Sequence, residues 1–173
     1  MTSNTRGSGR ILGSLRSADG KGIVRMQDRF ETDIDDLWSA ITDPERLAHW
    51  YGDVEGDLRL GGEFRARLFA SGWEGTGRVD VCQPPRRLRV TTEGPGRSGR
   101  GVIEVTLAGN GDRTALVWEE RGMPLDLIAA YGAGIQVHVE DLASYLVAQA
   151  RCDAQARWNE LIPAYQDLAA NAS

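Results

Sequence analysis

The chain has 173 residues, 41% of them hydrophobic and 26% charged, which suits one globular domain with a sizeable core and argues against a largely disordered chain. Its formal net charge of −5 argues against a nucleic-acid-binding protein, because phosphate contacts require clustered Lys and Arg. Two widely spaced cysteines, a polar N-terminus and the lack of an apolar stretch of about 20 residues predict a reduced, cytoplasmic protein without a membrane span.

The first predicted element is a β-hairpin. The segments ILGSLR (11–16) and IVRMQDRFE (23–31) have sequence patterns typical of β-strands. Asp19-Gly20 between them can supply the positive φ angles of a tight turn. Residues 1–10 precede this hairpin and are expected to be a flexible terminus.

Two short helices are predicted next. In TDIDDLWSAI, either Asp33 or Asp35 can cap a helix whose apolar residues then recur at helical spacing. In TDPERLAHWYG, Asp43 is the predicted cap and Pro44 fits the first helical turn, because proline lacks the N–H that a first turn leaves unpaired. The predicted buried face of the second helix comprises Leu47, Trp50 and Tyr51.

From residue 53 to residue 120 the sequence alternates between apolar and polar residues in short runs separated by turn signals. Arg65 and Arg67, for example, alternate with Phe64 and Ala66, so we expect the arginines on the solvated face; the opposite assignment would place them in a pocket for an anion. The pattern predicts an antiparallel sheet with one buried face. Its expected strands lie in DVEGDLRL, GGEFRARLFA, WEGTGRVDVCQPP, RRLRVTTE, GRGVIEVTLAG and RTALVWEE.

From Pro124 onward the apolar period becomes helical and continues for about 25 residues, to Leu146. A second helical segment, RWNELIPAYQDLAA, follows, and Pro163 is expected to bend or restart it. The separation of strands from helices predicts an α+β fold in which the long helix lies across one face of a curved sheet.

Gly132 and Gly134 interrupt this long helix, at a cost of about 1 kcal/mol each relative to alanine. They allow close packing of the helix, a hollow beside it, or an end or break of the helix at Gly132. A hollow between sheet and helix, lined by aromatic residues, would be a ligand site. The candidate wall residues are Trp50, Phe64, Leu116, Trp118, Tyr131, Ile135, His138 and Leu142.

In order along the chain, the segments DLWSAITDPERLAHWYG, GDLRLGGEFR, GTGRVDVCQPPRRLRV and GDRTALVWEERG, followed by the long helix, resemble the SRPBCC superfamily of START-like, helix-grip proteins. The sequence is most similar to the branch related to activators of the ninety-kilodalton heat-shock-protein ATPase. The resemblance covers about residues 22–148 and implies a helix-grip domain over 11–150, with 151–173 as an extra helical segment. It also implies a cavity for lipids, polyketides or other apolar molecules.

The sequence departs from this branch in its last helix. Members of the branch usually carry Gly-Trp there, whereas this chain has Gly134-Ile135, a change that would widen the cavity. Gly94, Gly96 and Gly99 spell G-x-G-x-x-G, but they lie between two strand patterns, which predicts a hairpin loop and no dinucleotide site. The spacing of cysteines and histidines predicts no metal site, and no cofactor is expected.

These observations favour a non-catalytic protein that binds an apolar molecule. The alternatives are a cyclase- or hydrolase-type enzyme with His138 as acid or base beside Glu104 or Glu120, and a protein-interaction module that binds the heat-shock ATPase by analogy. A lone helical histidine beside a core is more often a hydrogen-bonded packing residue than a catalytic one, and His49 is expected at the surface. The apolar residues Trp158, Leu161 and Tyr165 need cover, either from their own domain or from a second copy in a homodimer.

Overall fold

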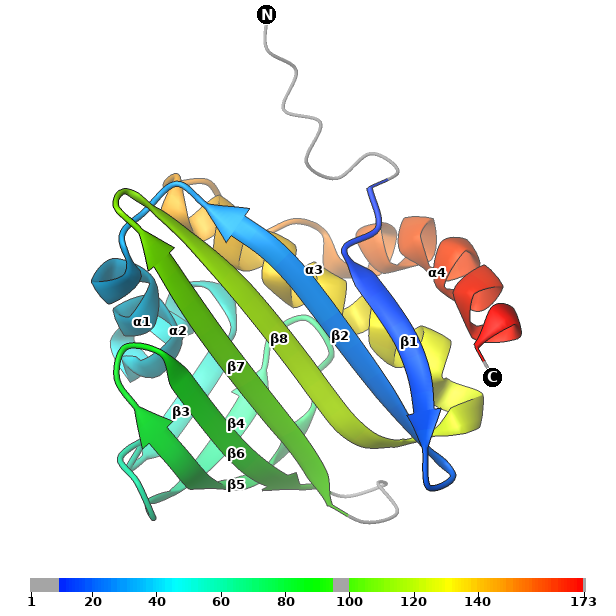
Figure 1. Ribbon diagram of the computed structural model, residues 1–173, viewed down its shortest axis with the longest axis horizontal. Coiled ribbons are helices and arrows are strands. Elements are labelled where there is room, and N and C mark those ends of the chain that lie inside the picture. Colours follow the sequence, from blue (N-terminus) through cyan, green and yellow to red (C-terminus); the bar gives the residue numbers. More distant parts are fainter. Residues whose placement is uncertain (1–9, 95–99, 173) are drawn as a thin grey trace, which may run out of the picture.

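The computed structural model describes residues 10–94 and 100–172, which form one antiparallel sheet and four α-helices (Figure 1). The sheet order is β1-β2-β8-β7-β6-β5-β4-β3, so each strand pairs with its neighbours in sequence except where β2 pairs with β8. The strands are β1 (Gly13–Ala18), β2 (Lys21–Phe30), β3 (Gly52–Gly56), β4 (Glu63–Leu68), β5 (Glu74–Gln83), β6 (Arg87–Glu93), β7 (Gly101–Asn110) and β8 (Arg113–Pro124). The predicted flexible terminus 1–10, apart from Arg10, and most of the predicted glycine-rich loop lie outside the described residues.

The predicted N-terminal hairpin is confirmed. Ala18 pairs with Lys21 across a two-residue turn, and both turn residues have positive φ, 53° at Asp19 and 76° at Gly20. Asp57 ends the third strand earlier than the sequence pattern suggested, because its carboxylate accepts a hydrogen bond from Arg59 N at 2.9 Å and forms a local turn. The predicted strand DVEGDLRL is therefore correct only for its first half.

Helices α1 (Ile34–Thr42) and α2 (Pro44–Trp50) begin where the capping signals indicated. Asp33, the first of the two predicted caps, accepts a hydrogen bond from Asp36 N at 2.8 Å. Asp43 accepts from Glu45 N at 3.0 Å, and Pro44 occupies the first turn of α2. The two helices lie at one end of the sheet, where their buried residues close the core.

The long helix α3 (Ile128–Leu146) crosses one face of the curved sheet, next to β1, β2 and β8 (Figure 1). It is continuous through Gly132, so the helix break that the glycines would permit does not occur. The prediction that helical structure starts at Pro124 was wrong. Pro124 and Met123 still pair with β2, which extends β8, and a short 3₁₀ turn (Leu125–Leu127) leads into α3.

Helix α4 (Ala154–Asn171) packs on α3 and on the edge strand β1. Leu161 and Tyr165 are fully buried and Trp158 is half-buried, so this chain itself covers the apolar residues of the segment. Pro163 lies inside α4, which continues through it, so the predicted restart of the helix does not occur. In the described part of the chain, no helix has the length and apolar character needed to cross a membrane.

Candidate functional site

A cavity of about 670 Å³ lies between the inner face of the sheet and α3. This volume falls within the range of about 300–1,000 Å³ that is usual for small-molecule sites. The sheet contributes its inner-facing residues to the wall. The end of α1, α2, the β3–β4 connection, the β4–β5 turn, the 3₁₀ turn before α3, α3 itself and the start of α4 contribute the rest. The wall residues that come from the sheet are Val54, Phe64, Ala66, Leu68, Leu88, Val90, Thr92, Ile103, Val105, Trp118 and Glu120.

The alternation of the strands explains why this wall is apolar. Arg65 and Arg67 are exposed on the outer face, as the sequence predicted, and Arg67 forms an ion pair with Asp53 there. Phe64 and Ala66 point inward from the same strand and line the cavity. The sheet thus separates a charged outer surface from an apolar inner one.

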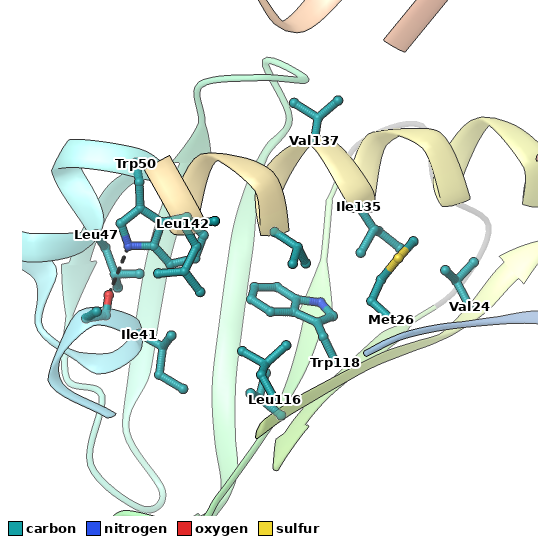
Figure 2. Close-up of a cluster of buried hydrophobic side chains, with 14 of the residues drawn as sticks. Val24, Met26, Ile41, Leu47, Trp50, Leu116, Trp118, Ile135, Val137 and Leu142 are labelled. Atoms are coloured by element: carbon teal, nitrogen blue, oxygen red, sulfur yellow. Dashed lines mark hydrogen bonds between the residues drawn. The ribbon is translucent and has the colours of Figure 1, made fainter. Parts of the chain in front are cut away.

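Four rings form an aromatic cluster at the α2 end of the cavity: Trp50, Tyr51, Trp118 and His138. The ring centroids of Trp50 and Trp118 are 6.3 Å apart in an edge-on arrangement, and those of Tyr51 and His138 are 4.9 Å apart, also edge-on. Trp50 is fixed by a hydrogen bond from its Nε1 to Ala40 O at 3.0 Å, which is drawn in Figure 2. Edge-on aromatic pairs are favourable and fix ring orientation, so this end of the wall is rigid.

Two glycines on β5 make room for aromatic rings on the opposite side of the cavity. A Cβ at Gly77 would lie 2.2 Å from Cζ of Phe64, and one at Gly75 would lie 2.4 Å from Cζ2 of Trp73. Neither position could therefore carry a side chain while the rings keep their places. The glycines let Phe64 and Trp73 lie flat against the sheet as parts of the wall.

The two glycines of α3 serve different purposes. A Cβ at Gly132 would lie 2.6 Å from Cδ1 of Tyr165, so this glycine permits close packing of α4 on α3. A Cβ at Gly134 would have no neighbour within 4 Å, and Gly134 lines the cavity. The prediction of close helix packing is thus correct for Gly132, and the prediction of a hollow beside the helix is correct for Gly134.

His138 is 5% exposed and lines the cavity from α3. Among the described residues, its Nδ1 has no hydrogen-bond partner. Burial lowers the pKa of His138 to about 4, because the charged imidazolium loses its hydration there. His138 is therefore neutral near pH 7 and presents an imidazole that is free to exchange hydrogen bonds with a ligand.

The two carboxylates considered as partners of His138 have other contacts. Glu104 accepts from Arg87 Nη2 at 2.8 Å, on the face of the sheet away from the cavity. Glu120 is 8% exposed and lines the cavity, where it accepts a hydrogen bond from Trp118 Nε1 at 2.9 Å. Of the two, only Glu120 lines the cavity, from β8, while His138 lines it from α3.

Six of the eight candidate wall residues line the cavity: Trp50, Phe64, Trp118, Tyr131, Ile135 and His138. Leu116 and Leu142 do not line it and are buried at 1% and 0% exposure. In Figure 2, Leu142 lies beside Trp50, and Leu116 lies below Trp118 on the side of the sheet. The sequence identified their inward face correctly, but both side chains are covered by the packed core and do not face the cavity.

The sequence did not identify Trp73 and Trp158 as wall residues, and it named Glu120 only as a possible partner of His138. The paired glycines of EGTGR were the available signal for Trp73, because alternate glycines on an inner strand face leave space for rings. Trp158 comes from α4, where its Nε1 donates to Ala130 O on α3 at 3.1 Å. Its position depends on how α4 docks, and no local sequence pattern encodes that.

Exposed wall residues mark the mouth of the cavity. They are Ser71 and Gly72 in the β4–β5 turn, Leu127 before α3, and Gln155 at the start of α4. Nearby, the Arg151 guanidinium lies 4.4 Å from the ring centroid of Phe69 and so joins the α3–α4 connection to the β4–β5 turn. His49 is exposed, as expected, and stacks on Tyr145 away from the cavity.

Within residues 10–94 and 100–172, no three His, Cys, Asp or Glu side chains form a group that could hold a metal ion. The thiol of Cys152 lies beside Asp141, and burial with this carboxylate raises its pKa to about 12. The thiol is therefore protonated at neutral pH and is a poor nucleophile.

A curved antiparallel sheet that closes on a long helix over an aromatic cavity defines the helix-grip class of proteins, as the sequence predicted. The chain belongs to the Activator of Hsp90 ATPase homolog 1-like family, whose model matches residues 31–147. No curated protein matches the chain.

Solved structures agree with this assignment. CalU16 from Micromonospora echinospora superposes with a TM-score of 0.75 at 25% identity, over 91% of this chain and 95% of CalU16. DynU16, from the dynemicin biosynthetic locus, superposes with a TM-score of 0.69 at 28% identity, over 79% of this chain and 51% of DynU16. A conserved Enterococcus faecalis protein, EF2215, shares the fold at 16% identity with a TM-score of 0.67, over 90% of this chain and 91% of EF2215.

Proposed function

We propose that this protein is a non-catalytic binding protein that holds a mainly apolar small molecule, of a lipid-, polyketide- or aromatic-like kind, in the cavity between the sheet and α3. The single observation that carries the proposal is the cavity of about 670 Å³, walled by apolar and aromatic side chains. Removing apolar ligand surface from water at such a wall is favourable by roughly 25 cal/mol per Å². The similarity to DynU16, a protein of a biosynthetic locus, agrees with a small organic ligand.

The contacts of His138 favour binding over catalysis. A general acid or base works best with a pKa near the operating pH, whereas burial lowers the pKa of His138 to about 4. Glu104 is engaged with Arg87 on the outer face, and Glu120 accepts a hydrogen bond from Trp118. The enzyme alternative remains testable, since it requires that His138→Ala abolish turnover while ligand uptake is retained.

Native mass spectrometry of the protein purified from its own source tests the proposal. We expect a bound molecule that is lost on denaturation. A neutral dye, N-phenylnaphthylamine, should also bind with one-to-one stoichiometry and quench the fluorescence of Trp50 and Trp118. A protein that carries no adduct and takes up no dye would contradict the proposal.

Gly134 offers a variant that blocks the cavity without changing its other walls. Gly134→Phe would direct a ring into the open space where no atom lies within 4 Å of a Cβ, and it should weaken dye binding at least about tenfold. Gly134→Ala is the matched control, because it adds one methyl group and improves helix propensity while leaving the cavity open. Equal dye affinity in all three proteins would place the dye elsewhere.

Binding to the heat-shock ATPase rests on the family description alone. A pull-down with the purified ATPase tests it directly. The Gly134→Phe variant separates the two roles, because it should change dye binding and leave an interaction at the outer surface unaffected.

A further inference from the structure

The charges on the cavity wall restrict the charge that a ligand inside the cavity can carry. Among the described wall residues, Glu120 is the one that carries a formal charge, and none is Lys or Arg. A carboxylate or sulfonate inside the cavity would lose its hydration without meeting a cation, and burying an unpaired charge is costly. The wall therefore disfavours anionic ligands, whether or not Glu120 is itself compensated.

His138 cannot supply the missing positive charge. Burial lowers its pKa to about 4, so the imidazole is neutral at physiological pH. A neutral imidazole can, however, exchange one hydrogen bond with a neutral group, and the Nδ1 of His138 has no partner among the described residues. A buried polar atom without a partner costs free energy that a ligand hydroxyl or amine could recover.

The aromatic walls favour a flat ligand. At one end of the cavity Tyr51 packs edge-on against His138, and Trp50 and Trp118 pack on Tyr51; on the other side Phe64 and Trp73 lie over the glycines of β5. Planar rings or conjugated chains can stack on such faces with a favourable offset geometry.

We infer that the ligand is a neutral, planar aromatic or conjugated molecule with a hydroxyl or amine group that hydrogen-bonds to His138, and that the interior of the cavity rejects anionic groups. This inference rests on the proposed function and adds the charge and polar group of the ligand. It also gives the Nδ1 of His138, which has no hydrogen-bond partner among the described residues, a role that a purely apolar ligand would leave unfilled.

Two dyes of nearly identical shape test the exclusion of anions. N-phenylnaphthylamine is neutral, and anilinonaphthalenesulfonate has the same ring system with an added sulfonate. We expect the neutral dye to bind at least about tenfold more tightly, as measured by competition against a single bound probe. Equal or tighter cavity binding of the sulfonate, removed by Gly134→Phe, would overturn the inference but leave the proposed function intact. Failure of both dyes to bind would count against the proposed function itself.

Naphthol and its methyl ether test the hydrogen bond to His138. The ratio of their dissociation constants should shift by about tenfold between the wild type and His138→Phe, because the variant keeps a ring but loses the polar atoms. His138→Gln, which can still form a hydrogen bond, should restore part of the preference for naphthol and covers the case in which the phenylalanine variant folds poorly. His49→Phe, at the surface, is the matched control. An unchanged ratio in both His138 variants would refute the role assigned to His138.

Discussion

The side chain of Tyr165 on α4 packs directly over Gly132 on α3, so that a Cβ at Gly132 would lie 2.6 Å from Cδ1 of the tyrosine ring. Tyr165 is fully buried and its hydroxyl is hydrogen-bonded at both sides, so the ring has little freedom to move away. Gly132→Ala should therefore lower the free energy of unfolding by about 1–3 kcal/mol, in spite of the better helix propensity of alanine. Urea denaturation measures this change.

Gly134→Ala is the natural comparison, because it makes the same chemical change two residues further along the same helix. No atom lies within 4 Å of a Cβ there, so only the gain in helix propensity remains, and the free energy of unfolding should rise by up to about 1 kcal/mol. Opposite signs for the two variants are expected. If both were stabilising, the contact between Gly132 and Tyr165 would be looser than described.

This pair of glycines also shows which structural features can be predicted from the sequence and which cannot. The caps at Asp33 and Asp43 and the turn at Asp19-Gly20 were predictable, because each depends on residues within a few positions along the chain. Which of Gly132 and Gly134 faces a neighbour depends on where α4 docks. Periodicity along α3 contains no information about that.

The wall of the cavity shows the same limit of sequence-based prediction. Alternation along β8 correctly placed Leu116 and Trp118 on one inner face, but only Trp118 lines the cavity. The difference arises because the core covers Leu116 to 1% exposure, whereas Trp118 keeps a face toward the cavity that Ile41 of α1 and Leu47 of α2 also line. Periodicity therefore identifies the face of an element, whereas the extent of a cavity along that face depends on the packing of other elements.

Removing one hydroxyl should loosen the N-terminal edge of the sheet. Tyr165 Oη accepts a hydrogen bond from Gly13 N at 3.1 Å and donates to Gln136 Oε1 at 2.5 Å, so it links β1, α3 and α4. Tyr165→Phe leaves the Gly13 amide without this acceptor and should cost about 1–3 kcal/mol. Hydrogen exchange should become faster at Gly13 and remain unchanged at the centre of β8. Uniform acceleration throughout the sheet would instead indicate global destabilisation.

The ion pair between Arg157 on α4 and Glu140 on α3 should contribute to holding the two helices together. The guanidinium donates two hydrogen bonds to this carboxylate, at 2.7 and 2.9 Å, and the two side chains are only 9% and 17% exposed. Arg157→Met keeps the aliphatic stem but leaves Glu140 without its cation, which should cost about 2–3 kcal/mol. Thermal or urea unfolding measures the loss.

Arg59 provides the control for this substitution, since it makes a comparable two-point contact with Asp57 while its side chain is 89% exposed. Exposed ion pairs contribute little because water screens both charges. Arg59→Met should leave the unfolding midpoint unchanged. An equal loss in both variants would mean that burial of the Arg157 pair contributes nothing to its strength.

The buried imidazole of His138 should make the protein sensitive to mild acid. Burial lowers its pKa from 6.5 to about 4, so between these values the unfolded chain binds a proton at His138 that the folded chain does not. Stability therefore falls as the pH decreases through this window, by about 3 kcal/mol in total for this residue, and the contribution is fully restored above the unfolded pKa. His138→Phe should remove this part of the pH dependence, as measured by urea denaturation at several pH values between about 4 and 7. His49→Phe should keep the wild-type slope, because His49 is exposed, and a slope that is the same in all three proteins would show that His138 is not buried as a neutral ring.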